Sequence, residues 1–406
     1  MNACRICGEK SIVEFFDFAR QPLSNSFADA AAGGREFAFR LAAGFCTGCT
    51  MAQQLEEAPR DRVFPADYPY RSSESAGSRR HFTEAAKTLI ATELTGSDPF
   101  IVEIGSNDGI MLRTVKEAGI RHLGVDPAKD AAELAAAEGV RVRVGLFAEP
   151  TALEIRAADG PANVVYSANT ISHIPGIESI FDGVRALLAP GGVFVFEDRY
   201  VSDIVENTYF DQIYDAHFYL FAVRSVQAMA ARFGFDLIDA EHLPVHGGSI
   251  RYTVARSGER RPRASVGEFL ARERERNLSD PDVYRAFGAR ARATCGNLTA
   301  LLRDLRAAGR SVVGYGATAK SATVTNYCGI GPDLVPFICD STPAKQGTLT
   351  PGSHIPVRPP EAFSRPYPDY ALLFAWNHAE EIMAKERGFR DAGGKWILYV
   401  PDVHIV

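Results

Sequence analysis

Apolar residues in the middle of the chain recur in short runs that predict alternating strands and helices. Four such runs, at residues 100–109, 122–128, 163–170 and 191–198, have the length of buried strands, and each is followed by a turn and a helical stretch. The clearest helix is the alanine-rich segment 127–139. This alternation is typical of an α/β fold with a parallel, doubly wound sheet.

A second α/β pattern begins near residue 244. A long charged helical region, from Val266 to Ala308, is interrupted at the sequence SDPD. Further strand–loop–helix units follow at residues 311–327, 334–345, 370–376 and 395–403. We therefore expect a second α/β domain in the C-terminal part of the chain.

The first 75 residues show little periodicity and are rich in cysteine, proline and aromatic residues. A small irregular domain of this kind needs a staple such as a metal ion. The three patterns together predict three domains, at residues 1–75, 76–243 and 244–406. The length of 406 residues agrees, because a single core rarely extends so far.

Composition and charge narrow the possible partners and the compartment. A net charge of −6 and a pI near 5.9 argue against nucleic-acid or anionic-membrane binding, which favours a basic surface. No stretch approaches the roughly 20 apolar residues of a membrane span, and the N-terminus lacks the apolar core of a signal peptide. We expect a cytoplasmic protein with reduced thiols, in which paired cysteines indicate a metal more often than a disulfide.

Two CxxC pairs, formed by Cys4, Cys7, Cys46 and Cys49, predict a zinc site in the N-terminal domain. Each pair can present two thiolates on one turn, and four thiolates complete a tetrahedral zinc set. Redox activity or chance pairing is the alternative. A closed shell of four thiolates leaves no position for water or substrate, so the predicted zinc is structural.

A methyl-donor site is predicted at the turn after the first central strand. There Glu103 stands within the strand, and Gly105, Asn107 and Gly109 form a glycine-bearing turn that lets the backbone approach a ligand. No GxGxxG sequence follows, so the usual dinucleotide fingerprint is absent.

Three further loops are expected to converge on the same crevice, because a doubly wound sheet binds ligands at the carboxyl ends of its strands. Asp126 ends the next strand and can bind two ribose hydroxyls. Leu146 and Phe147 fall where an adenine ring would pack, and Asn169 where the methyl group would meet its acceptor. We predict S-adenosylmethionine as the ligand; another nucleotide, or a fold without this ligand, is the alternative.

Over nearly its whole length the chain resembles the zinc-containing sugar C-methyltransferases. The resemblance is carried by the two CxxC pairs and, in order, by QPLSNSF, YPYRSSES, VEIGSNDG, ANTISHIP, FDQIYDAHFYLF, HGGSIR, NYCGIGPDL, DSTPAKQG, PGSHIPV and AWNHAEEI. Members of this family methylate nucleotide-linked 4-keto-deoxysugars in antibiotic and surface-polysaccharide pathways. The resemblance implies an N-terminal zinc lobe, a central Rossmann-like methyltransferase domain and a C-terminal Rossmann-like domain, with the substrate between them.

The resemblance also implies an active site. His217 matches the proposed catalytic base and Tyr214 an active-site tyrosine, while His173 matches a second active-site histidine. A tyrosine of the zinc lobe, Tyr68 in preference to Tyr70, is expected to reach the site, with Tyr70 placed at the substrate.

One position departs from the family pattern. Relatives commonly carry an acidic residue immediately before the base, where this chain has Ala216. Asp215, which we expect near the substrate, stands one residue earlier. Successive residues project in different directions, so Asp215 is not a simple replacement.

The chemistry of a ketosugar explains why a histidine is needed. A ketone at C4 acidifies the proton on C3, and a histidine of near-neutral pKa can remove that proton to form an enolate. Tyrosine hydroxyls can donate hydrogen bonds to the enolate oxygen. The alternatives are that His217 bridges buried backbone groups and that His173 only anchors its loop.

In the C-terminal domain we expect contacts with the nucleotide diphosphate, which needs N–H donors and a cation. The candidates for substrate binding there are His246, Tyr315, Thr318, Lys320, Lys345 and His354. The alternative is that these loops only pack against the methyltransferase domain.

Two other functions remain open at this point. One is a zinc-ribbon methyltransferase of nucleic acid, against which the acidic balance argues. The other is a relative that binds donor and sugar but has altered or lost the reaction, as Ala216 suggests. For the assembly we expect a monomer or a weak homo-oligomer.

Overall fold

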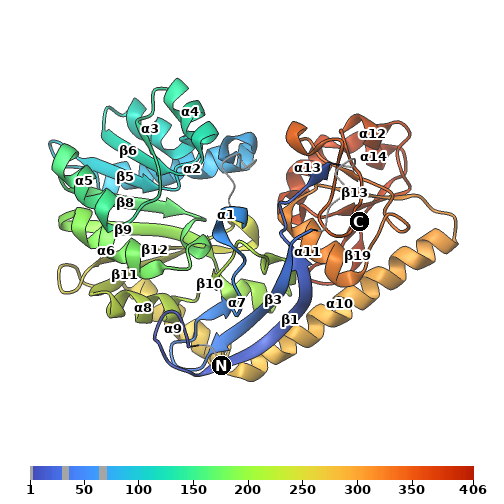
Figure 1. Cartoon of the computed structure of the whole chain (residues 1–406), viewed down its shortest axis with the longest axis horizontal. Helices are drawn as coiled ribbons and strands as arrows, with labels where there is room; N and C mark the ends of the chain where they lie inside the picture. Colours follow the sequence, from blue (N-terminus) through green and yellow to red (C-terminus); the bar gives the residue numbers. More distant parts are fainter. Residues whose placement is uncertain (1–2, 30–35, 64–70) are drawn as a thin grey trace.

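The computed structural model describes residues 3–29, 36–63 and 71–406. It is divided into an N-terminal lobe of antiparallel strands, a central α/β domain and a C-terminal α/β domain (Figure 1). The lobe lies across the base of the other two, between the central domain on the left of Figure 1 and the C-terminal domain on the right.

The N-terminal lobe is a sheet that takes its last strand from the central domain. Its strand order is β1–β3–β4–β10, with β1 (Ile12–Pro22), β3 (Ala38–Cys46), β4 (Ala52–Gln54) and β10 (Tyr219–Leu220). Tyr219 pairs with Gln53 and Leu220 with Ala52. The chain segment around His217 is therefore bound directly to the lobe. A short helix, α1 (Arg60–Val63), follows β4.

The central domain has a seven-stranded sheet in the order β11–β12–β9–β8–β5–β6–β7. Its strands β5 to β9 are parallel, and β11 and β12 are added antiparallel at one edge. The strands are β5 (Phe100–Ile104), β6 (Arg121–Asp126), β7 (Val142–Val144), β8 (Ala162–Ala168), β9 (Leu188–Arg199), β11 (Phe235–Leu243) and β12 (Ser249–Arg256).

Helices cover both faces of this sheet, and buried apolar clusters lie on each. They are α2 (Ala76–Thr92), α3 (Ile110–Glu117), α4 (Lys129–Ala137), α5 (Glu149–Asp159), α6 (Ile177–Leu187), α8 (Val223–Arg232) and α9 (Ala264–Glu275). Helix α7 (Val201–Glu206) packs instead in the apolar cluster that contains α10. The predicted α/β class is thus confirmed, and the four predicted strands correspond to β5, β6, β8 and β9.

The C-terminal domain has a six-stranded sheet in the order β16–β14–β13–β17–β18–β19, parallel except for β19. Its strands are β13 (Val312–Tyr315), β14 (Ile338–Cys339), β16 (Val357–Arg358), β17 (Tyr370–Leu373), β18 (Lys395–Leu398) and β19 (His404–Ile405). Its helices are α11 (Ala319–Cys328), α12 (Glu361–Ser364), α13 (Ala379–Lys385) and α14 (Arg387–Asp391).

The boundary after residue 243 stays a prediction, and one strand beyond it joins the central sheet. Strand β12, which we assigned to the C-terminal domain, pairs with both β9 and β11 and so completes the central sheet. The break predicted at SDPD is correct, because α9 ends at Glu275 and α10 (Pro281–Ala307) starts just after Asp280. Asp280 caps α10 by accepting a hydrogen bond from the backbone N–H of Asp282.

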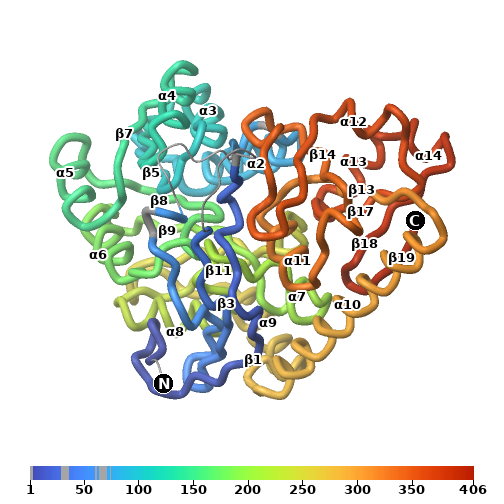
Figure 2. The backbone as a smooth tube through the Cα atoms, turned by 45° about the vertical axis from the view of Figure 1, so that its right-hand side comes forward, coloured from blue at the N-terminus to red at the C-terminus, as the bar shows by residue number. Residues whose placement is uncertain are grey.

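Helix α10 joins the three parts. It starts beside α9 and β1 and runs along the C-terminal domain, as both Figure 1 and Figure 2 show. Buried residues of β1, of α10 and of the C-terminal domain form one apolar cluster. A two-stranded sheet of β2 (Ala28–Asp29) and β15 (Thr348–Leu349) adds a second link between the lobe and the C-terminal domain. In the described part of the chain, none of the helices has the length and apolar character of a membrane span.

Replacing Phe16 by alanine tests whether this shared cluster holds the three parts together. Phe16 is 2% exposed, and its ring centroid lies 4.5 Å from that of Phe18 and 5.3 Å from that of Tyr327. We expect the free energy of unfolding to fall by about 3–5 kcal/mol in chemical denaturation. The surface substitution Leu153→Ala, at a side chain that is half exposed, serves as the control and is expected to cost less than about 0.5 kcal/mol. An equal effect of the two would contradict the shared core.

Candidate functional site

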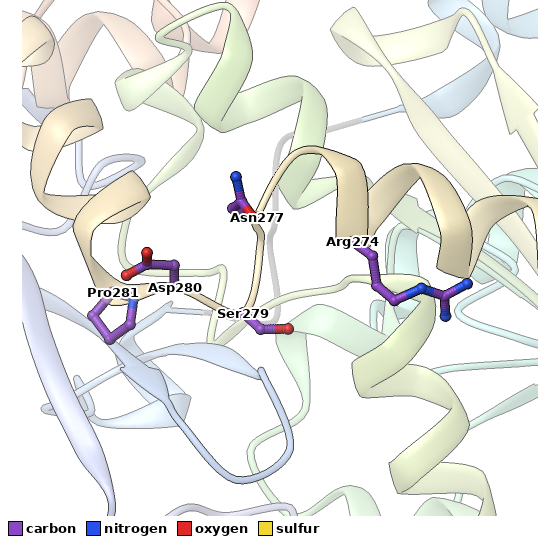
Figure 3. A pocket seen from close by; sticks show the side chains of 5 residues that line it. All are labelled: Arg274, Asn277, Ser279, Asp280 and Pro281. Atoms are coloured by element: carbon purple, nitrogen blue, oxygen red, sulfur yellow. The ribbon is translucent and has the colours of Figure 1, made fainter.

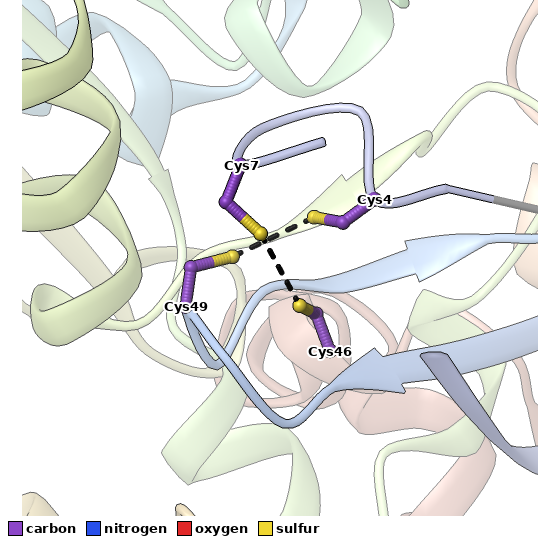
Figure 4. Close-up of side chains that lie close together, drawn as sticks. All are labelled: Cys4, Cys7, Cys46 and Cys49. Carbon is purple, nitrogen blue, oxygen red and sulfur yellow. Dashed lines mark hydrogen bonds between the residues drawn. The ribbon is translucent and has the colours of Figure 1, made fainter. Parts of the chain in front are cut away.

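The four cysteines predicted to bind zinc come together in the N-terminal lobe (Figure 4). Their sulfur atoms all lie within 4.8 Å of one another, and the Sγ–Sγ distances are 3.5 Å for Cys4 and Cys49 and 3.5 Å for Cys7 and Cys46. A tetrahedron with Zn–S bonds near 2.3 Å has sulfur–sulfur edges of about 3.8 Å, so the donor set fits zinc. A hydrogen bond with Cys49, the largest influence, lowers the pKa of the Cys4 thiol to about 4.

The donor loop between β5 and α3 requires glycine at two positions. Gly105 has φ +72°, and a Cβ atom there would lie 2.3 Å from Oγ1 of Thr170. Gly109 has φ +74°, and a Cβ there would lie 2.9 Å from the Cβ of Ala135. Only glycine adopts this backbone conformation freely and leaves room for the neighbouring side chains.

Buried carboxyl groups surround this loop. Glu103 Oε2 and Asp108 Oδ1, together with the Ser106 hydroxyl, are buried and lack a hydrogen-bond partner among the described residues. Burial raises the pKa of Glu103 well above its usual range, and the carboxylates of Asp126 and Asp108 raise it further. Unsatisfied buried oxygens and mutually repelling carboxylates favour a positively charged ligand, and a sulfonium donor with an amino group fits that description.

Asp126 and Asn107 help to hold the loop itself. The Asp126 carboxylate accepts hydrogen bonds of 2.8 Å from the backbone N–H groups of Asn107 and Ala128. Asn107 Oδ1 accepts a bond of 3.0 Å from the backbone of Ser72, and Asp108 Oδ2 one of 3.0 Å from Ser73. The residues just before α2, Ser72 and Ser73, therefore lie against the donor loop, which sequence reasoning did not anticipate.

The two residues expected at the adenine ring differ in their surroundings. Leu146 is 54% exposed, whereas Phe147 is buried in the apolar cluster under α6. A Cβ at Gly183 of α6 would lie 2.7 Å from the Phe147 ring. Asn169, at the carboxyl end of β8, accepts a hydrogen bond of 3.4 Å from Nη1 of Arg199.

The structure brings together the predicted base, the tyrosine and the second histidine. The ring centroids of Tyr214 and His217 are 3.9 Å apart, and those of His173 and His217 are 5.2 Å apart with nearly parallel planes. Nδ1 of His217 lies 2.6 Å from the carbonyl oxygen of Gln212. Because a carbonyl only accepts, this contact assigns the proton to Nδ1 and leaves Nε2 as the basic nitrogen.

Burial and charge keep both imidazoles neutral. Burial, then the positive charge of Arg199, lowers the pKa of His217 well below its usual range and that of His173 to about 3. Nε2 of His217 is buried and has no hydrogen-bond partner in the described residues. The imidazole of His217 is therefore a neutral base with its accepting nitrogen available.

The lobe fixes the His217 segment through side chains as well as through β10. Nε2 of Gln54 donates a bond of 2.6 Å to the carbonyl of Tyr214. Asp215 Oδ1 accepts a bond of 3.1 Å from the backbone of Ser24, and burial raises the pKa of this carboxyl to about 6. Asp215 is thus engaged by the lobe, and Ala216 is 1% exposed.

Two further candidates come from different domains: Lys320 belongs to α11 of the C-terminal domain, and His246 to the turn between β11 and β12 of the central sheet. Nζ of Lys320 lies 4.3 Å from the centroid of the Trp376 ring and 2.5 Å from Asn377 Oδ1. Burial lowers the pKa of Lys320 to about 8, while the carboxylate of Asp211 opposes that shift. Burial and the charges of Arg199 and Lys320 lower the pKa of His246 well below its usual range.

Two other residues expected at the nucleotide have roles within the C-terminal domain. The Tyr315 hydroxyl donates a bond of 2.7 Å to Glu386 Oε1. The Thr318 side chain caps α11 by accepting a bond of 3.2 Å from the backbone of Ser321.

The last two residues expected at the nucleotide, Lys345 and His354, contact the N-terminal lobe or nearby backbone. Nζ of Lys345 donates a bond of 2.8 Å to the carbonyl of Ala317 and lies 5.1 Å from the centroid of Phe27. Nε2 of His354 is 3.2 Å from Glu36 Oε1. We expected these loops either to bind nucleotide or to pack on the methyltransferase domain; the structure shows that both also contact the lobe, and nucleotide binding stays a prediction. Tyr68 and Tyr70 lie outside the described residues.

Sequence reasoning missed the polar residues that connect these parts. Arg199 donates to Gln212 Oε1 over 3.0 Å, and Nε2 of Gln212 donates to the His246 carbonyl over 2.8 Å. Glu197 Oε2 is 2.6 Å from Nε2 of His81. Their position in the sequence could have identified two of them, because Glu197 and Arg199 stand at the carboxyl end of a predicted strand, where ligands bind in this fold.

A surface hollow at the turn between α9 and α10 lies apart from this site (Figure 3). It shares no residue with the donor loop or the His217 segment, and it is lined by Arg274, Asn277, Ser279, Asp280 and Pro281. We assign it no role.

Substitution of a zinc ligand tests the metal site. We expect wild-type protein to contain about one zinc ion per chain and Cys46→Ser to lose most of it, with a lower thermal midpoint, because the four-thiolate set is broken. Zinc is measured by plasma emission spectrometry. The matched control Cys295→Ser, at a buried cysteine in α10 far from the cluster in sequence, is expected to keep its zinc. Full zinc retention in Cys46→Ser would exclude the proposed ligand set.

Two glycine substitutions test the donor loop. Gly105→Ala and Gly119→Ala impose the same strain, since the φ values are +72° and +74°, but a Cβ at Gly119 has no neighbour within 4 Å. We expect Gly105→Ala to weaken binding of S-adenosylhomocysteine at least tenfold, because the new methyl group displaces Thr170 at the loop. Gly119→Ala is expected to bind normally. Isothermal titration calorimetry distinguishes them, and equal affinities would argue against this loop as the donor site.

Comparison with known proteins places these features in a family. Residues 4–64 match the family model of a zinc binding domain, residues 78–240 that of a methyltransferase domain, and residues 244–401 that of a C-methyltransferase C-terminal domain. The C-methyltransferase NovU of Streptomyces niveus is 33% identical, in an alignment that covers 100% of this chain and 97% of the relative.

Other similarities are restricted to part of the chain. An uncharacterized methyltransferase of Mycobacterium leprae (strain TN) is 27% identical over 23% of this chain and 35% of its own. The solved structure of the glycopeptide N-methyltransferase MtfA with S-adenosylmethionine covers 43% of this chain and 93% of its own, with 13% identity and a TM-score of 0.34. The full-length match and the three family models agree, so the chain belongs to the C-methyltransferase family and is an S-adenosylmethionine-dependent C-methyltransferase with a structural zinc site.

Proposed function

We propose that this C-methyltransferase acts on a nucleotide-diphosphate 4-keto-deoxysugar and methylates the carbon next to the ketone, most simply C3. The observation that carries the proposal is the state of His217. Its imidazole is neutral, its Nδ1 is held by a carbonyl, and its Nε2 is left without a partner in the described residues. A carbon acceptor needs such a base, because a sugar carbon is nucleophilic only after it loses a proton.

We assign a role in this reaction to each of three residues. Nε2 of His217 accepts the C3 proton, and the electrons of the C–H bond move into the carbonyl group as an enolate. S-adenosylmethionine, when bound, supplies an electrophilic methyl group on a sulfonium that leaves as a neutral thioether. The Tyr214 ring beside His217 carries a hydroxyl that we assign as a hydrogen-bond donor to the substrate. His173 stacks on His217, and we place it beside the substrate.

Gln212 holds the imidazole of His217 in this chain, which lacks the carboxylate that relatives commonly carry before the base. Its carbonyl oxygen accepts a hydrogen bond of 2.6 Å from the N–H at Nδ1 of His217, so the imidazole keeps one orientation and one tautomer. A carbonyl dipole stabilises the imidazolium that forms on proton transfer, although less strongly than a carboxylate would. We therefore expect methyl transfer to proceed with Ala216 in place.

The C-terminal domain is proposed to bind the nucleotide end of the substrate. Lys320 provides a partly buried cation, and Asn377 and Trp376 hold its ammonium group in place. A diphosphate is the anionic part of the substrate, and a desolvated ammonium group binds it as a point charge. We propose the nucleotide sugar lies between this domain and the carboxyl ends of the central strands.

Replacing the base tests the proposal. A panel of uridine, thymidine and guanosine diphosphate 4-keto-6-deoxysugars is incubated in D₂O with S-adenosylhomocysteine, and exchange of the proton next to the ketone is followed by NMR. We expect His217→Gln to lower this exchange and methyl transfer by about 10²–10⁴-fold while donor binding stays intact.

The histidine substitution His404→Gln, near the C-terminus, is the matched control and is expected to leave both rates unchanged. Failure of the wild type to exchange or methylate any ketosugar would overturn the proposed substrate class. Normal exchange in His217→Gln would overturn the role of the base.

A further inference from the structure

Arg199 is a mostly buried cation of the candidate site with no role in the reaction proposed above. It is the last residue of β9, at the carboxyl end of the central sheet, and its side chain is 12% exposed. Nε donates to Gln212 Oε1 over 3.0 Å and Nη1 to Asn169 Oδ1 over 3.4 Å. Among the residues that the structure describes, none accepts a hydrogen bond from Nη2.

The positive charge of this guanidinium is poorly compensated. Its nearest carboxylate is Asp198, whose Oδ1 lies 3.8 Å from Nη1. That carboxylate already accepts backbone hydrogen bonds from Ser172, over 2.9 Å, and from Arg199 itself, over 3.1 Å. A mostly buried charge is costly when its ion pair is long and its carboxylate is shared with backbone donors, and a bound anionic oxygen would offset that cost.

Gln212 couples the guanidinium to the base. Its side-chain oxygen accepts from Arg199, its backbone carbonyl holds Nδ1 of His217 over 2.6 Å, and its amide nitrogen donates to the His246 carbonyl. Gln212 is 1% exposed, so these contacts are made inside the protein. The distance between guanidinium and base is therefore set by one rigid side chain and its backbone.

The location also distinguishes two possible anions. Arg199 contacts Asn169, which ends β8, so it lies at the carboxyl ends of adjacent central strands, on the donor side of the site. Lys320, the candidate for the diphosphate, belongs to α11 of the other domain. The acceptor oxygen that becomes negative in the reaction must lie beside the base and the donor, and Arg199 is the cation held there.

We propose that Arg199 is a catalytic residue that stabilises the negative charge developing on the acceptor's carbonyl oxygen as His217 removes the adjacent proton. This inference rests on the proposed function. The electron pair of the broken C–H bond moves to the carbonyl oxygen, the proton moves to Nε2 of His217, and Arg199 neither gains nor loses a proton because guanidinium stays protonated. A preorganised donor in a water-excluded site is the usual means of stabilising such an oxyanion.

The same charge acts on the base. The groups that face His217 are Tyr214 in its own segment, His173 of the 3₁₀ turn Ile171–His173, Arg199 of β9 and His246 of the 3₁₀ turn Val245–Gly247. Of these only Arg199 carries a permanent positive charge, which disfavours the imidazolium. Removing it raises the pKa of His217, so the acidic limb of the pH profile of kcat/KM moves to higher pH.

The test compares Arg199→Gln, Arg199→Lys and the wild type on whichever ketosugar diphosphate of the panel the wild type turns over. For Arg199→Gln we expect proton exchange and kcat to fall by about 10²–10³-fold, with KM changed less than about threefold. We also expect the acidic limb to shift upward. Arg199→Lys, which keeps the charge, is expected to be at least about tenfold faster than Arg199→Gln and to keep the wild-type pH profile.

Arg256→Gln is the control, because Arg256 donates to backbone carbonyls of Leu188 and Ala189 at the other end of β9. We expect its pH profile to be that of the wild type, whatever its thermal midpoint. A raised KM with unchanged kcat in Arg199→Gln would assign the residue to the diphosphate and overturn the inference. An unshifted pH profile in Arg199→Gln would also overturn it, as would an Arg199→Lys variant that is no faster than Arg199→Gln. If the wild type itself exchanges no proton on any ketosugar, the proposed function fails, and the inference falls with it.

Discussion

The pairing of β4 with β10 is the contact on which the active site depends. Only two residue pairs form it, Tyr219 with Gln53 and Leu220 with Ala52, yet it makes a segment of the central domain the last strand of the lobe's sheet. Cys46 ends β3 and Cys49 lies in the turn that leads into β4. The zinc cluster therefore fixes the turn that aligns β4, and β4 in turn fixes the segment that carries His217. A structural metal would thus act on the proposed base through strand geometry alone.

The two halves of the site have opposite charge. Around the donor loop, buried carboxyl groups such as Glu103 and Asp108 favour a cation. Around His217, Arg199 and Lys320 create a positive environment, and burial keeps His217 neutral within it. This separation suits a reaction in which a cationic donor meets an acceptor that becomes anionic. In the mechanism that we propose, the charge that weakens the base also stabilises the product of deprotonation, so a base of low pKa can serve.

Much of the fold could be predicted from local pattern. The central strands, the break between α9 and α10 and the four cysteines are all determined by residues close in sequence, through apolar runs, a capping aspartate and the CxxC spacing. The placement of β12 could not be predicted, because strand pairing is a contact between distant segments and an antiparallel strand can join either neighbouring sheet. The uses of Lys345 and His354 were unpredictable for the same reason: their partners, Phe27 and Glu36, lie more than 300 residues away in sequence.

The sequence by itself determined the chemical groups: four thiolates for a metal, a glycine turn for a donor, and a histidine beside a tyrosine in a segment rich in rings. It could not reveal which nitrogen of His217 is free, which carbonyl holds the other, or that Arg199 binds the side chain of the same Gln212. Those properties depend on burial and on distances between β9, the His217 segment and the loop before β12. Such distances arise only when the lobe and the two domains pack together, and so the tertiary structure alone decided which of the available groups form the site.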